Sequence, residues 1–273
     1  MKNIGFDFEN ENGFFCVFWF YIQTYIFCRK NDKILYIKDD KWKFKHNNGL
    51  DDYIKLNSNI RKYTTNINET IFYSHMNVPD INLTLYDYIH YSKELFVIKS
   101  DILRNYDLPD TYNSIFLRGG DKLLYEAKQK PIEKYVNKLL ENGDNIKNVF
   151  VHSDDNLLVE KVRQYIKDNC IDLYVYNISN SNSNGGTVVM ERLKYGNCKT
   201  IKSLDEMSSI EIKEHTVLML NAIEIMRRSK NVVTSFDSNV SRFMKVNYNC
   251  NVYSVNGVNG NDNIYIKNPA YGF

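Results

Sequence analysis

The sequence lacks an excess of charge of either sign. Its 273 residues include 35 lysines and arginines and 33 aspartates and glutamates, so the formal net charge is +2. A balance this close to zero gives no electrostatic argument for nucleic acid as a partner. Hydrophobic residues make up 43% of the chain and charged residues 25%, which excludes disorder and collagen-like repeats. The length suffices for one large or two small α/β domains.

Cysteine is scarce, and no two cysteines stand in a CxxC motif. The five cysteines are an odd number without metal-ligand spacing, which argues against a disulfide framework or a structural zinc site. The chain also has no Walker A sequence, no G-x-S-x-G and no H-E-x-x-H. Since it contains no Asp-x-Asp triplet either, a Mg²⁺- or Mn²⁺-dependent glycosyl-transfer site of that type is disfavoured. We expect no metal and no other bound cofactor.

No apolar run is long enough to span a bilayer comfortably. The strongest run, residues 13–27, is interrupted by Gln23 and Thr24. Acidic residues, beginning with Asp7, precede it where a signal peptide would place lysine or arginine. We therefore predict a buried helix here, no transmembrane segment, and a protein that works in the cytoplasm.

Strand and helix patterns alternate after a polar stretch at residues 101–110, which is the best candidate linker. Such alternation predicts a doubly wound parallel sheet, in which ligands bind at the carboxyl ends of the strands. We divide the chain into a smaller α/β lobe over 1–108 and a sheet domain over 109–273. The expected strands are 114–117, 149–152, 171–176, 232–235 and 252–255, and the expected helices are 131–142, about 155–169, 216–229 and 238–246.

A glycine-rich turn follows the first strand of the sheet domain, where residues 116–122 read Phe-Leu-Arg-Gly-Gly-Asp-Lys. Gly119 and Gly120 would let a ligand approach the backbone closely. The guanidinium of Arg118 offers a planar set of donors suited to a diphosphate. The alternative is an ordinary β-turn with an arginine on the surface, and composition alone favours that alternative.

A lysine and a glutamate stand four residues apart just beyond this turn. If the stretch is helical, Lys122 and Glu126 share one face and can pair. A glutamate beside a lysine can act as a general base on a sugar hydroxyl. The alternative is a surface ion pair of small energetic value.

Two further groups follow strand ends and open helices. Asp154 and Asp155 either cap the helix that follows, contact a ligand at the sheet edge or, least favoured, bind a metal ion. Residues 235–242, Ser-Phe-Asp-Ser-Asn-Val-Ser-Arg, open another helix. The N–H groups at its N-terminus form a natural phosphate seat, to which Ser238 can add its hydroxyl. The alternative there is an ordinary N-cap by Asp237 or Ser238.

Taken in order, these four groups resemble the α1,6-fucosyltransferases, which include the animal core enzyme and the bacterial nodulation enzyme, with the protein O-fucosyltransferases more distant. The likeness is closest in LRGGDKLLYEAKQKPIEKY (117–135), similar to the family's strand, arginine-rich turn, Asp-Lys, Glu and Pro-Ile-Glu. It continues in VHSDDNLLVEK (151–161) and ends in SFDSNVSRF (235–243), similar to the family's Ser-Ser-Gln-Val-x-Arg turn. A weaker likeness at 13–53 extends it over most of the chain, from about residue 10 to about residue 255.

The resemblance implies a GT-B-like α/β fold with two lobes and an inverting, metal-independent glycosyltransferase. Residues 109–273 would form the Rossmann-like domain that binds a nucleotide-sugar donor, and 1–108 would lie on the side of a glycan or glycoprotein acceptor. Carried over, Glu126 would be the general base, Lys122 its orienting partner, and Arg118 the cation that holds the β-phosphate. The donor-binding residues would be Phe116, Arg118, Gly119, Gly120, Asp154, Asp155, Asn221, Glu224, Asp237, Ser238, Asn239 and Val240, with Ser238 and the backbone of the next two residues at the pyrophosphate.

The sequence departs from the family where the family reads guanine. The family's histidine before the essential arginine is Phe116 here, its second arginine is Gly119, and its helical aspartate falls on Ala222. Each missing hydrogen bond that leaves a polar group of the base unpaired costs about 1–3 kcal/mol. We therefore hypothesise a UDP-sugar donor such as UDP-xylose, with Phe116 stacked on the pyrimidine or packed beside it. The alternative is GDP-fucose, with guanine read by Asn221 or Glu224.

Two other classes of protein remain open at this point. One is an inactive nucleotide- or glycan-binding protein on the same fold, and the other is an unrelated α/β enzyme whose Arg-Gly-Gly turn binds another phosphate. The aromatic residues Trp42 and Phe44 could stack on sugar rings of an acceptor, although buried core is the more common role of such residues. The compact length and the over-use of Asn, Lys, Ile and Tyr suggest a microbial or viral enzyme that builds surface glycans.

Overall fold

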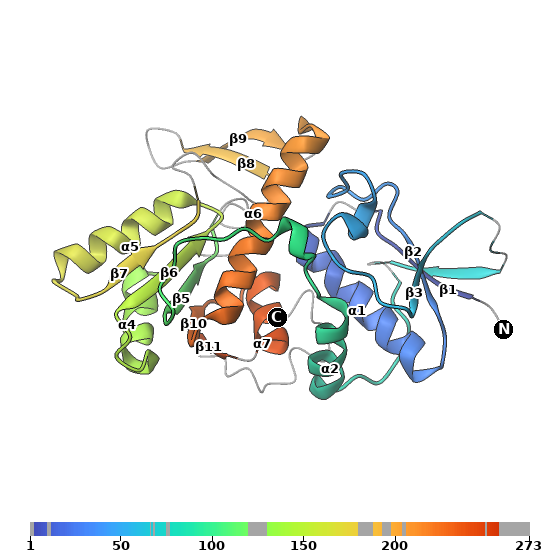
Figure 1. The fold of residues 1–273 in the computed structure, drawn as a ribbon, viewed down its shortest axis with the longest axis horizontal. Helices are drawn as coiled ribbons and strands as arrows, with labels where there is room; N and C mark the ends of the chain where they lie inside the picture. Colours follow the sequence, from blue (N-terminus) through green and yellow to red (C-terminus); the bar gives the residue numbers. More distant parts are fainter. Residues whose placement is uncertain are drawn as a thin grey trace. The chain divides into compact units, whose positions relative to one another are not determined.

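The computed structural model of the chain (Figure 1) describes residues 3–9, 12–65, 67, 69–74, 77–119, 130–179, 188–192, 198–203, 206–248 and 250–256. These residues divide into two compact units. Unit 1 consists of those within Met1–Leu103 and Ser208–Thr216, and unit 2 of those within Arg104–Met207 and Val217–Asp262. Each unit is built on a parallel sheet.

Unit 1 has a four-stranded sheet in the order β3-β2-β1-β4, and every neighbouring pair is parallel. The strands are β1 (Asn3–Asp7), β2 (Leu35–Lys38), β3 (Ile60–Lys62) and β4 (Thr70–Tyr73). The helices are α1 (Phe14–Lys30) and α2 (Leu85–Leu95), with short 3₁₀ turns at Gly49–Asp52 and Ser100–Ile102. The predicted helix over 13–27 is confirmed and continues to Lys30.

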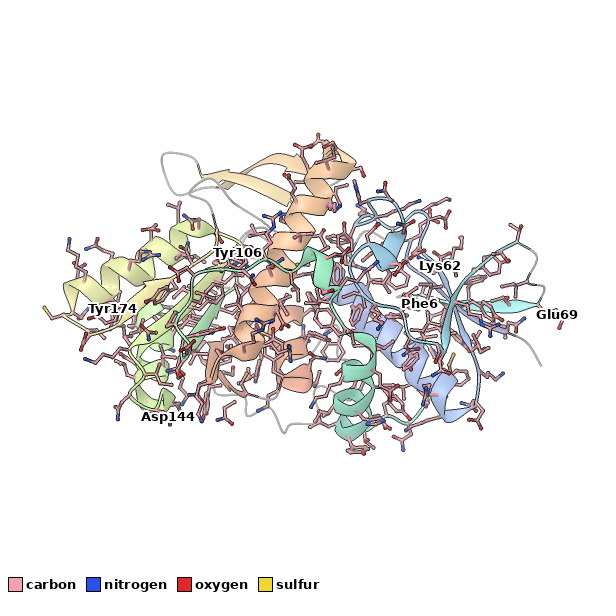
Figure 2. All side chains as sticks on the ribbon, viewed as in Figure 1. Phe6, Lys62, Glu69, Tyr106, Asp144 and Tyr174 are labelled. Atoms are coloured by element: carbon pink, nitrogen blue, oxygen red, sulfur yellow. The ribbon has the colours of Figure 1, made fainter. Side chains whose placement is uncertain are left out.

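Helix α1 contains the long apolar run and is buried along most of its length, because aromatic side chains surround it. Phe6 of β1, labelled in Figure 2, has its ring centroid 5.8 Å from that of Tyr21. The rings of Trp42 and Phe44 lie 5.1 and 5.5 Å from the ring of Phe14, and only 4% and 3% of these two residues is exposed. The aromatic patch is therefore core of unit 1 and offers no surface for sugar rings. Within the described ranges, no helix combines the length and the hydropathy needed to cross a membrane.

Unit 2 has a five-stranded sheet in the order β11-β10-β5-β6-β7, again parallel throughout. This is the doubly wound sheet that the alternating pattern predicted. The strands are β5 (Asn113–Leu117), β6 (Asn148–Ser153), β7 (Tyr174–Tyr176), β10 (Asn231–Thr234) and β11 (Asn251–Ser254). The helices are α4 (Ile132–Asn142), α5 (Asn156–Asp168), α6 (Ser209–Arg228) and α7 (Asn239–Asn247), and the first part of α6, up to Thr216, belongs to unit 1.

Helices lie on both faces of this sheet. The sheet grows from β5 toward β6 in one direction and toward β10 and β11 in the other, so right-handed crossovers place the connecting helices on opposite faces. On one face, Ile115 and Val151 pack into a core with Val136 of α4 and Val159 of α5. On the other, the Thr234 hydroxyl lies 2.7 Å from the Ser241 hydroxyl of α7.

Three features differ from the prediction. Strand β7 is Tyr174–Tyr176, shorter than the predicted 171–176. Helix α6 begins at Ser209, seven residues before the predicted start at 216. The prediction missed its first turns because they are largely exposed, with Ile210 63% exposed, and show no apolar face. An antiparallel hairpin of β8 (Val188–Arg192) and β9 (Cys198–Ser203) was not predicted at all.

Candidate functional site

The carboxyl ends of the strands of unit 2 bring most of the predicted site residues to one edge of the sheet. Arg118 and Gly119 follow β5, Asp154 and Asp155 follow β6, and the residues from Ser235 onward follow β10. Gly120, Lys122 and Glu126, which include the predicted general base, lie outside the described residues. Among the described residues, no group of His, Cys, Asp or Glu could hold a metal ion.

The Arg-Gly turn after β5 is joined to the Asp-Asp turn after β6. The Arg118 guanidinium forms an ion pair with the Asp154 carboxylate, and the Gly119 N–H donates to the same carboxylate. A Cβ added at Gly119 would lie 2.7 Å from Asp155 Cβ and 3.0 Å from Leu158 Cδ1, so the two turns pack as closely as glycine allows. The side chains of Arg118 and Asp154 are only 17% and 13% exposed. The ion pair with Asp154 therefore holds Arg118, the predicted phosphate-binding arginine, at the sheet edge.

The two neighbouring aspartates have different tasks. Asp155, 5% exposed, caps helix α5: its Oδ1 accepts the Leu157 N–H at 3.0 Å, and its own N–H donates to the Ser153 hydroxyl at 3.0 Å. The capping alternative is therefore observed for Asp155. Asp154 instead directs its carboxylate to Arg118 and Gly119.

The start of helix α7 forms the other part of this edge. Ser238, 1% exposed, is the N-cap and accepts the Val240 N–H at 3.2 Å. Asn239 Oδ1 accepts from the buried Arg242 guanidinium at 2.7 Å, which ties the first turn of the helix together. Asp237 stands just before the cap and accepts hydrogen bonds from Ser235 and Asn256. The N–H groups of this first turn, together with the helix dipole, favour an anion here.

Phe116 is buried, and a histidine on the neighbouring strand packs against it. Phe116 of β5 pairs with His152 of β6, and their rings stack with centroids 6.1 Å apart and an interplanar angle of 19°. Phe116 is 4% exposed and His152 is 8% exposed. Stacking of Phe116 on a pyrimidine would therefore require His152 to move. The register between β5 and β6, which brings His152 here, is not readable from the sequence.

The residues near the family's guanine-reading position make contacts within unit 2. Asn221, 2% exposed, accepts the Arg104 N–H at 2.7 Å and donates to the Val217 carbonyl at 2.8 Å. Ala222 is fully buried. Glu224 accepts from the guanidinium groups one turn further along α6, at 2.7 and 2.8 Å. Burial opposes ionisation of Glu224, but these hydrogen bonds from two arginines outweigh it and lower the pKa of the carboxyl.

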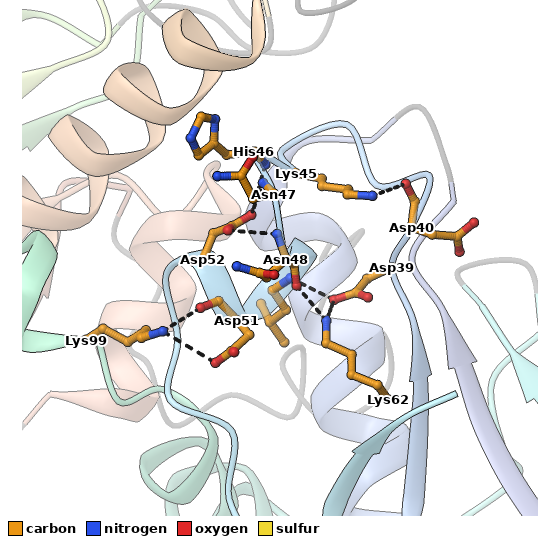
Figure 3. A network of polar contacts seen from close by, with 11 residues as sticks. Asp39, Asp40, Lys45, His46, Asn47, Asn48, Asp51, Asp52, Lys62 and Lys99 are labelled. Carbon is orange, nitrogen blue, oxygen red and sulfur yellow. Dashed lines mark hydrogen bonds and ion pairs between the residues drawn. The ribbon is translucent and has the colours of Figure 1, made fainter. Parts of the chain in front are cut away.

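Unit 1 contains a polar network that the sequence did not reveal (Figure 3), in the loop after β2. Asp52 accepts the N–H groups of His46, Asn47 and Asn48 at 2.8–2.9 Å; burial raises the pKa of this carboxyl, but the three hydrogen bonds outweigh it and lower the value. Asp39, 6% exposed, accepts the Leu50 N–H and an ion pair from Lys62. The loop is thereby held rigid at the carboxyl edge of its sheet, where ligands of parallel sheets commonly bind.

Comparison with solved structures finds fucosyltransferases. The chain is similar to the α-1,6-fucosyltransferase NodZ soaked with GDP-fucose, with a TM-score of 0.53 and 9% identity, over 90% of this chain and 93% of that chain. NodZ from Bradyrhizobium gives a TM-score of 0.54 at 8% identity over 90% and 93% of the two chains. POFUT1 in complex with GDP gives 0.53 at 10% identity over 94% and 98%. No protein-family model and no curated protein sequence matches the chain. The predicted resemblance and the GT-B-like fold class are thus confirmed as a likeness of fold.

Proposed function

We propose that the chain is a glycosyltransferase that moves a sugar from a nucleoside-diphosphate sugar to a hydroxyl group of a glycan or glycoprotein. The observation that supports this most is the coincidence of two facts. The fold resembles two kinds of fucosyltransferase over nine-tenths of the chain. The predicted diphosphate-binding residues Arg118 and Ser238 stand together at the carboxyl edge of the corresponding sheet, which is where ligands of doubly wound sheets bind.

The proposed reaction is an inverting transfer without a metal ion. The acceptor oxygen forms a bond to the anomeric carbon while the bond from that carbon to the β-phosphate oxygen breaks and leaves its electron pair on the phosphate. Glu126 takes the acceptor's proton, and Lys122 orients Glu126. Arg118 and the N–H groups at the start of α7 stabilise the charge that develops on the leaving diphosphate.

GDP-fucose is the donor that we place first. Of the similar solved structures, one was soaked with GDP-fucose and another is a complex with GDP. Phe116, which the UDP hypothesis would stack on a pyrimidine or pack beside it, is buried against His152. A UDP-sugar stays second for one specific reason. Asn221 and Glu224 already have protein partners, so reading guanine would require them to share or exchange these contacts. Competition between GDP and UDP for the donor site distinguishes the GDP-fucose hypothesis from the UDP-sugar hypothesis.

The test of the transfer reaction uses release of GDP from GDP-fucose in the presence of a released N-glycan mixture, with UDP-xylose in a parallel series. Glu126→Gln should fold and bind the nucleotide as the parent does and should lose transfer. Glu141→Gln is the matched control, since the Glu141 side chain is 62% exposed and pairs with Lys138 along α4. Transfer by Glu126→Gln near the parent rate would show that another group is the base. Nucleotide binding without transfer to any acceptor would favour the inactive binding protein.

A further inference from the structure

A second pair of opposite charges stands at the carboxyl edge of the sheet in unit 2, apart from Arg118 and Asp154. Lys130 immediately precedes Pro131, which caps α4, and its Nζ lies 3.6 Å from Oδ2 of Asp237. The side chain of Lys130 is 33% exposed and that of Asp237 is 16% exposed. A separation of 3.6 Å is longer than a hydrogen bond, so the ammonium group is close to the carboxylate without being locked to it.

Asp237, by contrast, is firmly held. Its Oδ1 accepts from Asn256 Nδ2 at 2.6 Å and its Oδ2 accepts from the Ser235 hydroxyl at 2.8 Å. Ser235 is 3% exposed, and its hydroxyl also lies 2.7 Å from Asn256 Oδ1. The residues that follow β10 and β11 thus fix the direction of this carboxylate. It stands next to Ser238, the N-cap of the helix to which we assign the pyrophosphate.

A carboxylate in this place opposes the binding of an anion. A nucleoside diphosphate brings at least two negative charges, and more charge develops on it as the glycosidic bond breaks. The charge of Arg118 is already balanced by Asp154. Arg242, 1% exposed, donates to Asn239 Oδ1 and to the Ser238 carbonyl and so holds the turn from within. Among the residues that the structure describes near this turn, Lys130 is a further cation, with 33% of its side chain exposed.

We propose that Lys130 is a second phosphate-binding cation of the donor site, where it offsets the negative charge of Asp237. The proposal rests on the proposed function, because it needs a diphosphate at the start of α7. While the site is empty, the ammonium group lies near the Asp237 carboxylate. When the diphosphate binds, the ammonium group donates to a phosphate oxygen and offsets the charge of the fixed carboxylate. Lysine suits this task because it is a compact charge on a flexible stem.

The two members of the pair therefore have opposite expected effects on anion binding. Lys130→Met should weaken GDP about 10- to 100-fold, the range expected for loss of one charged hydrogen bond. Asp237→Asn keeps the size of the side chain and can still form hydrogen bonds with Ser235 and Asn256, but removes the negative charge. It should bind GDP as tightly as the parent or more tightly. Lys130→Arg keeps a cation and should stay within a few-fold of the parent.

The experiment measures dissociation constants of GDP and GMP by calorimetry in EDTA, with UDP and UMP in place of these if the parent prefers uracil. Lys134→Met on α4 is the control for loss of one exposed lysine. Ligand-free thermal unfolding of every variant checks the fold. The Lys130→Met effect should be larger for the diphosphate than for the monophosphate.

Two results would overturn the proposed role of Lys130 and leave the proposed function standing. Parent-like GDP affinity in Lys130→Met would mean that the ammonium group does not touch the phosphates. Equal weakening by Lys130→Met and Asp237→Asn would mean that the pair is only structural, or that Asp237 holds a cation from solution. A parent that binds neither GDP nor UDP would overturn the proposed function itself and this proposal with it, before any variant is compared.

Discussion

The close contact between the Arg-Gly turn and helix α5 makes Gly119 the most sensitive small residue of the site. In Gly119→Ala the new Cβ would meet Asp155 Cβ at 2.7 Å and Leu158 Cδ1 at 3.0 Å. The Leu158 side chain can rotate, but Asp155 cannot retreat, because it is hydrogen-bonded to Ser153 and to the Leu157 N–H. The Arg118–Gly119 turn must therefore move.

Overpacking of this kind costs about 1–3 kcal/mol of unfolding free energy. At about 2–4 °C of Tm per kcal/mol for a chain of this size, we expect Gly119→Ala to lower the Tm by about 2–12 °C. The displaced Arg118 should also bind GDP less tightly. Differential scanning fluorimetry with and without GDP measures both effects.

A second substitution checks the cause. Asp155→Gly removes the Cβ that the alanine would meet, and glycine replaces an N-cap residue at a cost of only a few tenths of a kcal/mol. The double variant should therefore recover most of the stability and the GDP affinity that Gly119→Ala loses. A parent-like Tm and affinity in Gly119→Ala, or a double variant no better than Gly119→Ala, would refute the reasoning.

Two further predictions concern stability. The pKa of Glu224 lies below its ordinary value of 4.5, so its ionised form contributes stability above that pH and loses it as the pH falls through the lowered pKa. Urea unfolding at pH 7 and pH 4 should show a flatter pH dependence in Glu224→Gln than in the parent, and equal slopes would contradict the assignment. Asn113 donates to the Gly143 carbonyl at 2.7 Å and accepts from Asn231 at 3.0 Å, and both bonds are buried. Asn113→Ala leaves both partner groups buried without these bonds and should cost about 1–3 kcal/mol, measured in the same assay; a change under about 0.5 kcal/mol would mean that water replaces the asparagine.

Strands β5, β6 and β10 of unit 2 could be predicted because each is a short, mostly buried run between polar turns. Val232 and Val233 of β10 illustrate this, since both are completely buried and neighbour β5 and β11 on either side. Helix α6 was predicted too short, because its first turns lack the apolar face by which helices are recognised. The β8–β9 hairpin was missed because, among the described strands, β8 and β9 form a two-stranded sheet of their own and extend neither parallel sheet.

The site could be predicted in part. The N-cap roles of Asp155 and Ser238 can be predicted from the local sequence, since the contacts of an N-cap lie within three residues. The pairing of Arg118 with Asp154 depends on the register of β5 against β6, and that of Lys130 with Asp237 on the neighbourhood of α4 and β10. Such contacts between distant parts of the chain leave no local pattern. Lys130 was passed over for this reason.

The measurement that tests the central claim most directly is the thermal stability of the parent protein titrated with GDP and UDP in EDTA, beside Arg118→Gln. A ligand at 100 times its Kd adds about 2.7 kcal/mol to the free energy of unfolding. The account predicts that GDP stabilises the parent, more strongly than UDP, and that Arg118→Gln loses most of this effect. Stabilisation by UDP alone would indicate a UDP-sugar donor in place of GDP-fucose. No stabilisation by either nucleotide would contradict the claim that this sheet edge binds a nucleoside-diphosphate sugar.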